Sequence, residues 1–179
     1  MARATRWAAA LAAVALVAAC RQAPEALDPY HPPQPGEAPP EVVVQLLLVN
    51  RGAFDILPTH VNGVRVAFNG DPSDNKEEPL RIPPGRVRFV YRNVGTISHN
   101  LWVYGTAHDG GPVEVMAPRD PGYLLPGRVA EVEVELKEGT YSLSCGVTNH
   151  EARGMWRPLI VTAEAAYPPP PLGGAERGT

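Results

Sequence analysis

Three side chains that bind soft metals follow one another at even spacing near the C-terminus. Cys145, His150 and Met155 form a C-x4-H-x4-M pattern directly after a strand-like run. A second imidazole, His99, lies in another strand-like run further upstream. One thiolate, two imidazoles and one weak thioether donor suit copper that cycles between Cu(I) and Cu(II). Such a site requires no substrate pocket, so the pattern predicts a protein that carries one electron.

The alternation of side chains along these two runs predicts that His99 and Cys145 face the same interior. Neighbouring residues of a strand point to opposite faces of the sheet. His99 shares its face with apolar residues, namely Ile97, Leu101 and Val103. Cys145 shares its face with Tyr141 and Leu143, and serines occupy the other face. An apolar face points inward, so both donors are expected to be buried.

The segment after Cys145 must bring two further donors back to the same point. It carries His150 and Met155, and glycines at positions 146 and 154 give its backbone the freedom to turn. Zinc is the main competing metal, because it also accepts cysteine and histidine at four positions. A thioether is a poor zinc ligand, and structural zinc sites usually contain more than one cysteine. Met116 is the rival axial donor in the mature chain.

The elements that would position these donors are short strands. Residues 41–163 form one domain of a typical size for a single core. Apolar and alternating runs are separated by turn signals that contain Gly, Pro, Asn and Asp. The runs cover residues 41–49, 64–68, 86–92, 97–104, 129–136, 140–145 and 158–162. This pattern predicts an all-β sandwich of seven or eight strands, with an irregular segment over residues 105–125.

Two of these runs carry complementary charges and are expected to pair. Arginines at positions 86, 88 and 92 lie on the outer face of one run. Glutamates at positions 131, 133 and 135 lie on the outer face of the other. Opposite charges that face each other across a ladder stabilise it by roughly 0.2–1 kcal/mol per pair. We therefore predict that residues 86–92 and 129–136 are neighbouring strands.

The N-terminal segment predicts export. Residues 1–20 have two arginines, a short apolar stretch and the ending Val-Ala-Ala-Cys, as in a bacterial lipoprotein signal peptide. The resemblance implies that Cys20 becomes the acylated first residue; an ordinary secretory peptide is the alternative. Residues 21–40 contain seven prolines and are expected to be an extended linker. Residues 164–179 are expected to be a disordered tail rich in Pro and Gly.

Charge and cysteine usage exclude several classes of function. Removing the two arginines of the signal leaves a mature net charge of −5, from 14 basic and 19 acidic residues. No basic run indicates nucleic-acid binding. Cys145 is left without a cysteine partner in an oxidising compartment, where a metal would protect it. Hydrolase, zinc-protease and phosphate-loop motifs are not found. The remaining histidines, His31, His60 and His108, are expected in the linker or in loops.

Residues 86–104 and 130–161 resemble the two halves of a type 1 copper protein of the cupredoxin family. The C-x4-H-x4-M spacing followed by an aromatic residue resembles the sulfocyanin and rusticyanin branch. The resemblance implies a Greek-key sandwich and one copper ion bound by His99, Cys145, His150 and Met155. It also implies that Asn100 ties the ligand strand to the cysteine loop. Many members carry a hydroxyl residue where this chain has Gly146, which puts that hydrogen bond in doubt.

The same resemblance implies an electron carrier and not an enzyme. His150 would be the electron port, surrounded by Val147, Ala152 and Trp156. We expect a monomer that is anchored to the cell envelope through Cys20 and faces the periplasm or another extracytoplasmic space. Its partners would be respiratory proteins such as a cytochrome or a terminal oxidase. Two alternatives stay open: copper delivery, storage or sensing at the envelope, and a cupredoxin-shaped domain without metal.

Overall fold

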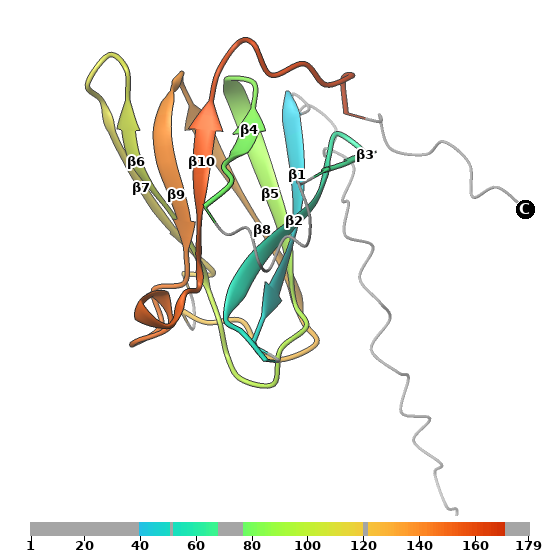
Figure 1. The fold of residues 1–179 in the computed structure, drawn as a ribbon, viewed down its shortest axis with the longest axis vertical. Coiled ribbons are helices and arrows are strands. Elements are labelled where there is room, and N and C mark those ends of the chain that lie inside the picture. Colours follow the sequence, from blue (N-terminus) through green and yellow to red (C-terminus); the bar gives the residue numbers. More distant parts are fainter. Residues whose placement is uncertain (1–39, 51, 68–76, 120–121, 171–179) are drawn as a thin grey trace, which may run out of the picture.

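The computed structural model describes residues 40–50, 52–67, 77–119 and 122–170 (Figure 1). The predicted signal peptide with Cys20, nearly all of the linker and the last part of the tail lie outside these ranges. Ten strands and one 3-10 helix make up the described part. No helix among these residues is long and apolar enough to cross a membrane.

The strands form two sheets that pack face to face as a sandwich (Figure 1). One sheet has the order β3-β2-β1-β5-β8 and the other has the order β4-β10-β9-β6-β7. The first contains β1 (Val42–Val49), β2 (Asp55–Val61), β3 (Val64–Arg65), β5 (Gly85–Asn93) and β8 (Val129–Leu136). The second contains β4 (Leu80–Ile82), β6 (Leu101–Ala107), β7 (Pro112–Ala117), β9 (Gly139–Ser144) and β10 (Trp156–Val161). The predicted all-β sandwich is confirmed.

Period-two alternation explains the core between the sheets. Along β1, Val44, Leu46 and Leu48 are at most 2% exposed, and they face inward together. The inner residues of β5, Phe89 and Tyr91, are fully buried as well. Most pairings are antiparallel, but β1 runs parallel to β5 and β10 runs parallel to β4. Because β1 and β5 run in the same direction, the residues that follow them, which are distant in the sequence, lie at the same end of the sandwich.

The predicted pairing of the charged strands is confirmed. β5 and β8 are antiparallel neighbours, and Arg86 lies opposite Glu135 while Arg88 lies opposite Glu133. The Arg88 Nε atom donates to Glu133 Oε1 at 2.6 Å. Arg92 lies opposite Val129 and therefore has no cross-strand glutamate. Two of the three arginines therefore lie opposite a glutamate, which favours this register.

Three strands were not predicted from the sequence. β2 contains Pro58, which breaks the apolar pattern, and His60 lies in this strand and not in a loop. β4 has only three residues. β7 lies inside the segment that was expected to be irregular; it is an edge strand with alternating exposure, which gives a weak hydrophobic signal. The strand count is therefore higher than predicted, within the predicted architecture.

One predicted strand begins later than expected. β6 starts at Leu101, whereas the alternating pattern suggested a start at Ile97. Ile97 is 39% exposed, so its placement on the buried face is wrong. Residues 94–100 instead form a loop at the end of the sandwich. That loop ends at His99 and Asn100, which are both buried.

The first residues of the predicted tail pack on the domain. Tyr167 is partly buried against the core. The Asn62 side chain donates to the backbone oxygen of Pro168 at 2.8 Å. The expected disorder therefore does not apply to residues 164–170, which cross the end of the sandwich far from the 3-10 helix (Figure 1). Residues 171–179 lie outside the described part.

Candidate metal centre

His99 is held by its own backbone at one end of the sandwich. It forms an isolated antiparallel bridge with Leu124 from the loop between β7 and β8. The His99 N–H donates to Leu124 O at 3.1 Å, and the Leu124 N–H donates to His99 O at 2.5 Å. Its imidazole is fully buried. The ring therefore projects into the interior from a clamped backbone.

Cys145 follows the last residue of β9 and points inward as predicted. Tyr141, Leu143 and Cys145 are 3%, 0% and 0% exposed. The Cys145 N–H donates to Met155 O at 3.0 Å, which closes the following loop. Cys145 is a free thiol, and its Sγ accepts the backbone N–H of Asn100 at 3.4 Å. Strand alternation and this loop closure together fix the direction of the sulfur.

The return of the chain to the site depends on a short 3-10 helix, η1 (Glu151–Arg153). His150 lies directly before it, and Met155 N–H donates back to His150 O at 3.0 Å. Gly154 ends the helix with φ 94°, a left-handed conformation that glycine adopts without steric cost. The predicted role of this glycine as the turning point is confirmed. The turn leaves His150 only 7% exposed.

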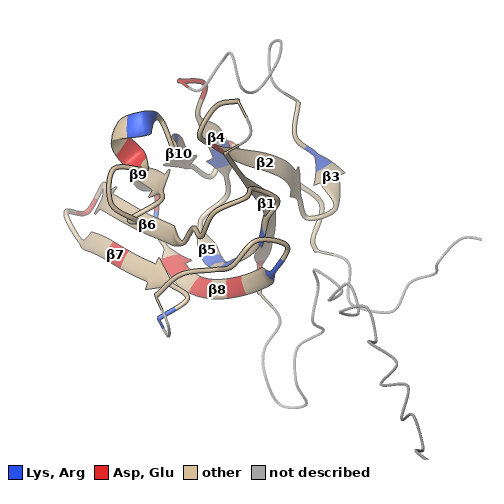
Figure 2. Cartoon of the chain, turned by 90° about the horizontal axis from the view of Figure 1, so that it is seen from below, with Lys and Arg blue, Asp and Glu red and all other residues tan. Residues whose placement is uncertain are grey.

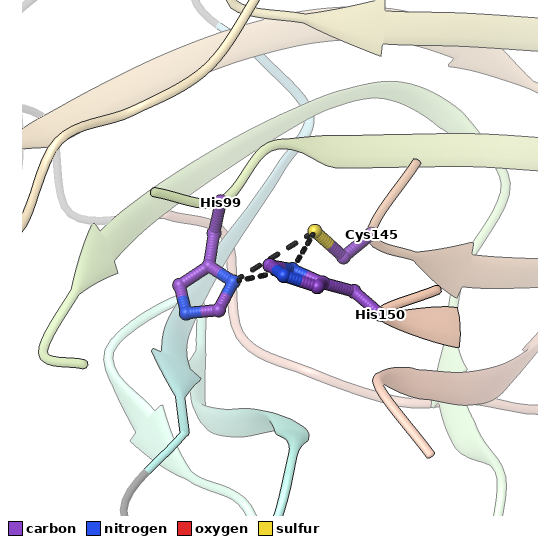
Figure 3. Close-up of side chains that lie close together, drawn as sticks. All are labelled: His99, Cys145 and His150. Atoms are coloured by element: carbon purple, nitrogen blue, oxygen red, sulfur yellow. Dashed lines mark hydrogen bonds between the residues drawn. The ribbon is translucent and has the colours of Figure 1, made fainter. Parts of the chain in front are cut away.

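Three donor atoms from these elements converge (Figure 3). The His99 Nδ1 and His150 Nδ1 atoms are 3.2 Å apart. Cys145 Sγ lies 3.8 Å from the former and 3.4 Å from the latter. A point equidistant from the corners of this triangle lies about 2.0 Å from each, close to the metal–imidazole bond length of about 2.0–2.1 Å. The donor set and its spacing fit one transition-metal ion, and two imidazoles with one thiolate favour copper.

Burial sets the protonation of these donors. The pKa of His99 is lowered from 6.5 to about 4, first by burial and then by the neighbouring His150. The pKa of His150 is also lowered, by burial and then by the Arg153 guanidinium. Burial raises the pKa of the Cys145 thiol, although the Asn100 N–H opposes this effect. At neutral pH both imidazoles are therefore uncharged, and the thiol loses a proton when a metal binds.

The predicted axial donor lies beside the triangle. Met155 is fully buried and is bonded through its backbone to both Cys145 and His150. Its role as axial ligand stays a prediction. The rival, Met116, is 40% exposed, and its Sδ accepts the Asn100 Nδ2–H at 3.2 Å. That hydrogen bond directs the Met116 sulfur toward Asn100, so Met155 remains the better candidate.

Asn100 joins the two ligand-bearing segments without a hydroxyl residue. Its Oδ1 accepts the backbone N–H of Gly146 at 2.7 Å. Its Nδ2 donates to Gly122 O at 3.1 Å, which adds the β7–β8 loop to the network. The backbone N–H of Gly146 thus makes the hydrogen bond to Asn100 that was in doubt because position 146 has no hydroxyl group. The tie between His99 and Cys145 is intact in this chain.

Two residues near the site were not predicted from the sequence. Asn50, directly after β1, places its Oδ1 3.2 Å from His99 Nε2. The Phe54 ring packs edge-on against both imidazoles, with centroid distances of 6.2 Å to His99 and 5.0 Å to His150. Arg153 covers the Phe54 ring at 3.9 Å. The only sequence feature that marks Asn50 is its position as a polar residue directly after an apolar strand. Nothing in the sequence predicts its contact with His99.

The two other histidines of the described residues, His60 and His108, do not join this cluster. His31 lies outside the described residues. His60 belongs to β2, and its Nδ1 is buried without a hydrogen-bond partner among the described residues. His108 follows β6 at the opposite end, where its N–H donates to Glu138 O at 2.7 Å. Trp156 begins β10 and pairs with Ser144, so it flanks the site without supplying a donor.

The low pKa of His99 makes the stability of the metal-free protein depend on pH. The unfolded chain takes up the proton near pH 6.5, whereas folded His99 takes it up only near pH 4. The contribution of neutral His99 to the free energy of unfolding should therefore be fully present above pH 6.5. It should be lost as the pH falls from 6.5 to 4. Denaturant titrations at several pH values measure this slope. His99→Leu should flatten it; an equal slope in the variant would contradict the assignment.

Known proteins were compared with the chain and with its fold. Residues 125–169 match the family model described as the sulfocyanin (SoxE) domain. Auracyanin from Roseiflexus castenholzii has 19% sequence identity and a TM-score of 0.43, over 67% of this chain and 96% of that one. Auracyanin A from Chloroflexus aurantiacus, a blue copper protein, has 14% identity and a TM-score of 0.45, over 67% and 98%. Reduced rusticyanin has 19% identity and a TM-score of 0.42, over 67% and 78%. None of the curated proteins matches the sequence.

The family match covers the loop that holds Cys145, His150 and Met155. The fold then adds His99 from outside the matched segment and completes a buried His–Cys–His cluster. The resemblance stated from the sequence is thereby confirmed. Residues 125–169 thus resemble a sulfocyanin domain, and the fold places His99 beside the Cys145 and His150 of that segment in a buried site that fits one copper ion.

Proposed function

We propose that this protein carries single electrons between redox partners outside the cytoplasmic membrane. The observation that carries the proposal is the buried triangle of two imidazole nitrogens and one thiol sulfur. A bound copper ion would supply the one-electron chemistry at this point. The protein would supply fixed donors, a dry environment and a short path to the surface. These are the requirements of a carrier and not of a hydrolytic or substrate-binding site.

Rigidity of the donors supports electron transfer over copper delivery. His99 and Cys145 are fully buried, and His150 is 7% exposed. Phe54, from the β1–β2 loop, packs against the imidazoles, and Arg153 of η1 in turn covers the Phe54 ring. Delivery requires ligand exchange with a second protein, which is easier at an open site. A closed site with donors fixed by hydrogen bonds keeps its geometry when the charge of the metal changes.

We also propose a carrier in place of an enzyme. The described residues contain one group of His, Cys, Asp or Glu side chains close enough to bind a metal, and it is the triangle itself. A copper enzyme that reduces a substrate needs a second metal or an open coordination position. His60 and His108 lie on β2 and beyond β6, away from each other and from the triangle. No pair of remaining histidines supports a second centre among the described residues.

The exposed apolar residues support a docking site at the metal end. Six large apolar side chains are exposed in the described part of the chain, and five of them lie at the metal end: Val94, Ile97, Met116, Tyr123 and Leu125. They occupy the β5–β6 loop, the end of β7 and the β7–β8 loop, on the side of His99. We name this set the apolar end patch. By contrast, the hollow beside Val147 and Ala152 is also lined by Thr148, Asn149 and Glu151. Docking near His150 alone therefore has less support than docking across the apolar end patch.

Hydrogen bonds hold the two loops of the patch together. The Asn93 Nδ2 atom donates to Ile97 O and to Leu124 O, at 2.8 Å in both cases. Gly127 N–H donates to Asn93 O at 2.8 Å. A surface that is already fixed loses little conformational entropy when a partner binds. This favours the brief, weak encounters that electron carriers make.

Charge around the patch favours a partner with an acidic rim. Arg119 and Arg128 are exposed in the described part of the β7–β8 loop, and Arg153 is exposed on η1. Glu151 is the acidic residue of η1, and its carboxylate accepts the Tyr104 hydroxyl at 2.7 Å. The view onto the metal end shows loops that are mostly uncharged, with one basic and one acidic stretch side by side on the short helix η1 (Figure 2). A cytochrome or a terminal oxidase with carboxylates around its electron-entry site would fit this surface.

The location of the carrier is a further part of the proposal. A lipid at Cys20 and the proline-rich segment that follows would hold the domain near the outer face of the cytoplasmic membrane or within the periplasm. The sequence of residues 1–20 supports this. Metabolic lipid labelling of the wild-type protein and of Cys20→Ala tests it. Label in the wild type that is lost in the variant is expected, and equal label in both would refute the anchor.

Copper loading tests the main proposal. Cu(II) added to the purified protein should give an intense visible absorption from the thiolate–copper bond, and Cys145→Ser should abolish it. Binding near neutral pH should release about one proton, because the thiol is protonated and both imidazoles are neutral. Visible and EPR spectra with a pH-stat measure these effects. A colourless protein that releases copper readily would favour delivery or storage instead.

The axial ligand is tested within the same experiment. Met155→Leu should keep the visible absorption but raise the reduction potential, since a donor that stabilises Cu(II) is lost. Met116→Leu is the matched control, because it removes the other thioether of the described chain near the site. An unchanged potential in Met155→Leu with a changed one in Met116→Leu would reverse the assignment.

Electron self-exchange between two copies tests the apolar end patch without a known partner. Leu125→Glu puts a charge on its most exposed residue and should slow self-exchange by about tenfold or more, because the two patches must meet. Val64→Glu is the control, since Val64 is exposed to a similar degree at the opposite end, on β3. NMR line broadening in mixtures of oxidised and reduced protein gives the rate. Equal slowing in both variants would show that the patch has no special role.

A further inference from the structure

Asn50 contacts both the ligand histidine and the loop that carries it. It lies directly after β1, at the metal end of the sandwich. Its Oδ1 is 3.2 Å from His99 Nε2 and accepts the Thr96 N–H at 2.7 Å. Its Nδ2 donates to Thr96 Oγ1 at 3.0 Å. One amide therefore spans from the first strand to the β5–β6 loop and to the imidazole.

These contacts fix which atom of the amide faces His99. A backbone N–H can only donate, so the atom that receives the Thr96 N–H must be the oxygen. The same oxygen faces His99 Nε2, and an oxygen of an amide can only accept. His99 Nε2 must therefore carry the proton. A neutral imidazole with a proton on Nε2 has its lone pair on Nδ1.

We propose that Asn50 is a positioning residue that holds His99 in the Nε2–H tautomer and turns its Nδ1 toward Cys145 and His150. The proposal rests on the proposed function only in taking Nδ1 as the metal donor. A histidine ligand usually donates its second ring N–H to such an acceptor, which fixes the tautomer and the ring plane. In this chain the acceptor comes from a segment far from the sulfocyanin match, at the end of β1.

Burial makes Asn50 hard to replace. The His99 ring is fully buried, so bulk water does not take over as acceptor for Nε2–H. The Phe54 ring stands edge-on to the imidazole and offers no acceptor in the ring plane. On the other side of the ring, Nδ1 already faces the two other donors. Without Asn50, the buried Nε2–H group would lack a partner, and the ring would turn or change tautomer.

Gly95 provides the space that this arrangement needs. A Cβ atom at position 95 would overlap Asn50 Oδ1 and would lie 3.0 Å from His99 Nε2. The φ angle of Gly95 is not in the left-handed region, so alanine is compatible with its backbone. Gly95→Ala would therefore displace the Asn50 amide while Asn50 itself stays in the sequence. It gives a second, independent way to break the contact.

The first measurement is made on the metal-free full chain and does not depend on copper. Long-range 1H–15N NMR spectra report which ring nitrogen of His99 carries the proton. The wild type should show Nε2–H, with slow exchange of that proton. Asn50→Ala and Gly95→Ala should lose this single tautomer, and Asn50→Asp should keep it because a carboxylate oxygen also accepts. Gly111→Ala is the control, since an added Cβ there meets only Asp109 Oδ1 at 3.4 Å.

The second measurement uses Cu(II) alone as the probe. Asn50→Ala and Gly95→Ala should each weaken Cu(II) binding by about 10–100-fold, whereas Asn50→Asp and Gly111→Ala should stay within a few-fold of the wild type. Should Asn50→Ala fail to fold, Gly95→Ala and Asn50→Asp carry the test. A wild-type tautomer with wild-type affinity in Gly95→Ala would overturn the proposal. A wild-type protein that binds no copper but shows the Nε2–H tautomer would refute the carrier function and leave the role of Asn50 standing.

Discussion

The register between β6 and β9 is the constraint on which the site depends. Trp102 lies opposite Ser144 in this antiparallel ladder. Extending the same register beyond the strand ends brings Asn100 next to Gly146 and Cys145. The bonds from Asn100 N–H to Cys145 Sγ and from Gly146 N–H to Asn100 Oδ1 continue the ladder through side-chain atoms. A slip of one residue would turn Cys145 to the outer face and separate it from both imidazoles.

The loops at this end then act as one unit. The β7–β8 loop bridges to His99 through Leu124, and the β1–β2 segment contributes Asn50 and Phe54. The loop after β9 returns His150 to the same point. Each loop is hydrogen-bonded to another loop and not only to its own strands. These hydrogen bonds fix the donors before a metal binds. The donor atoms would therefore move little when the charge of a bound metal changes.

The distribution of apolar and charged side chains separates two tasks. Glu133 and Glu135 of β8 lie opposite Arg88 and Arg86 of β5 and stabilise the first sheet. The metal end has few charges, and the apolar end patch lies on its surface. Although the chain has a net charge of −3, three exposed arginines, Arg119, Arg128 and Arg153, lie at this end. Net charge alone would have suggested a cationic partner, whereas these arginines are the basis for proposing an acidic one.

The sequence by itself determined the donor types, the C-x4-H-x4-M spacing and the inward direction of Cys145, whereas His99 faces inward from a loop that is bridged to Leu124 and not from the predicted strand. These follow from local rules, because period-two alternation and turn residues act over a few positions. The pairing of β5 with β8 was also accessible, since complementary charges recur at the same period.

Only the tertiary structure decided which distant residues meet. The contact between Asn50 and His99, the packing of Phe54 and the exposure of Ile97 depend on sheet order and on how the loops close. β7 escaped prediction because an edge strand with one exposed face has little hydrophobic signal. A contact between segments far apart along the chain leaves no periodic trace in either one, so sequence patterns fix the direction of a side chain but not its partner.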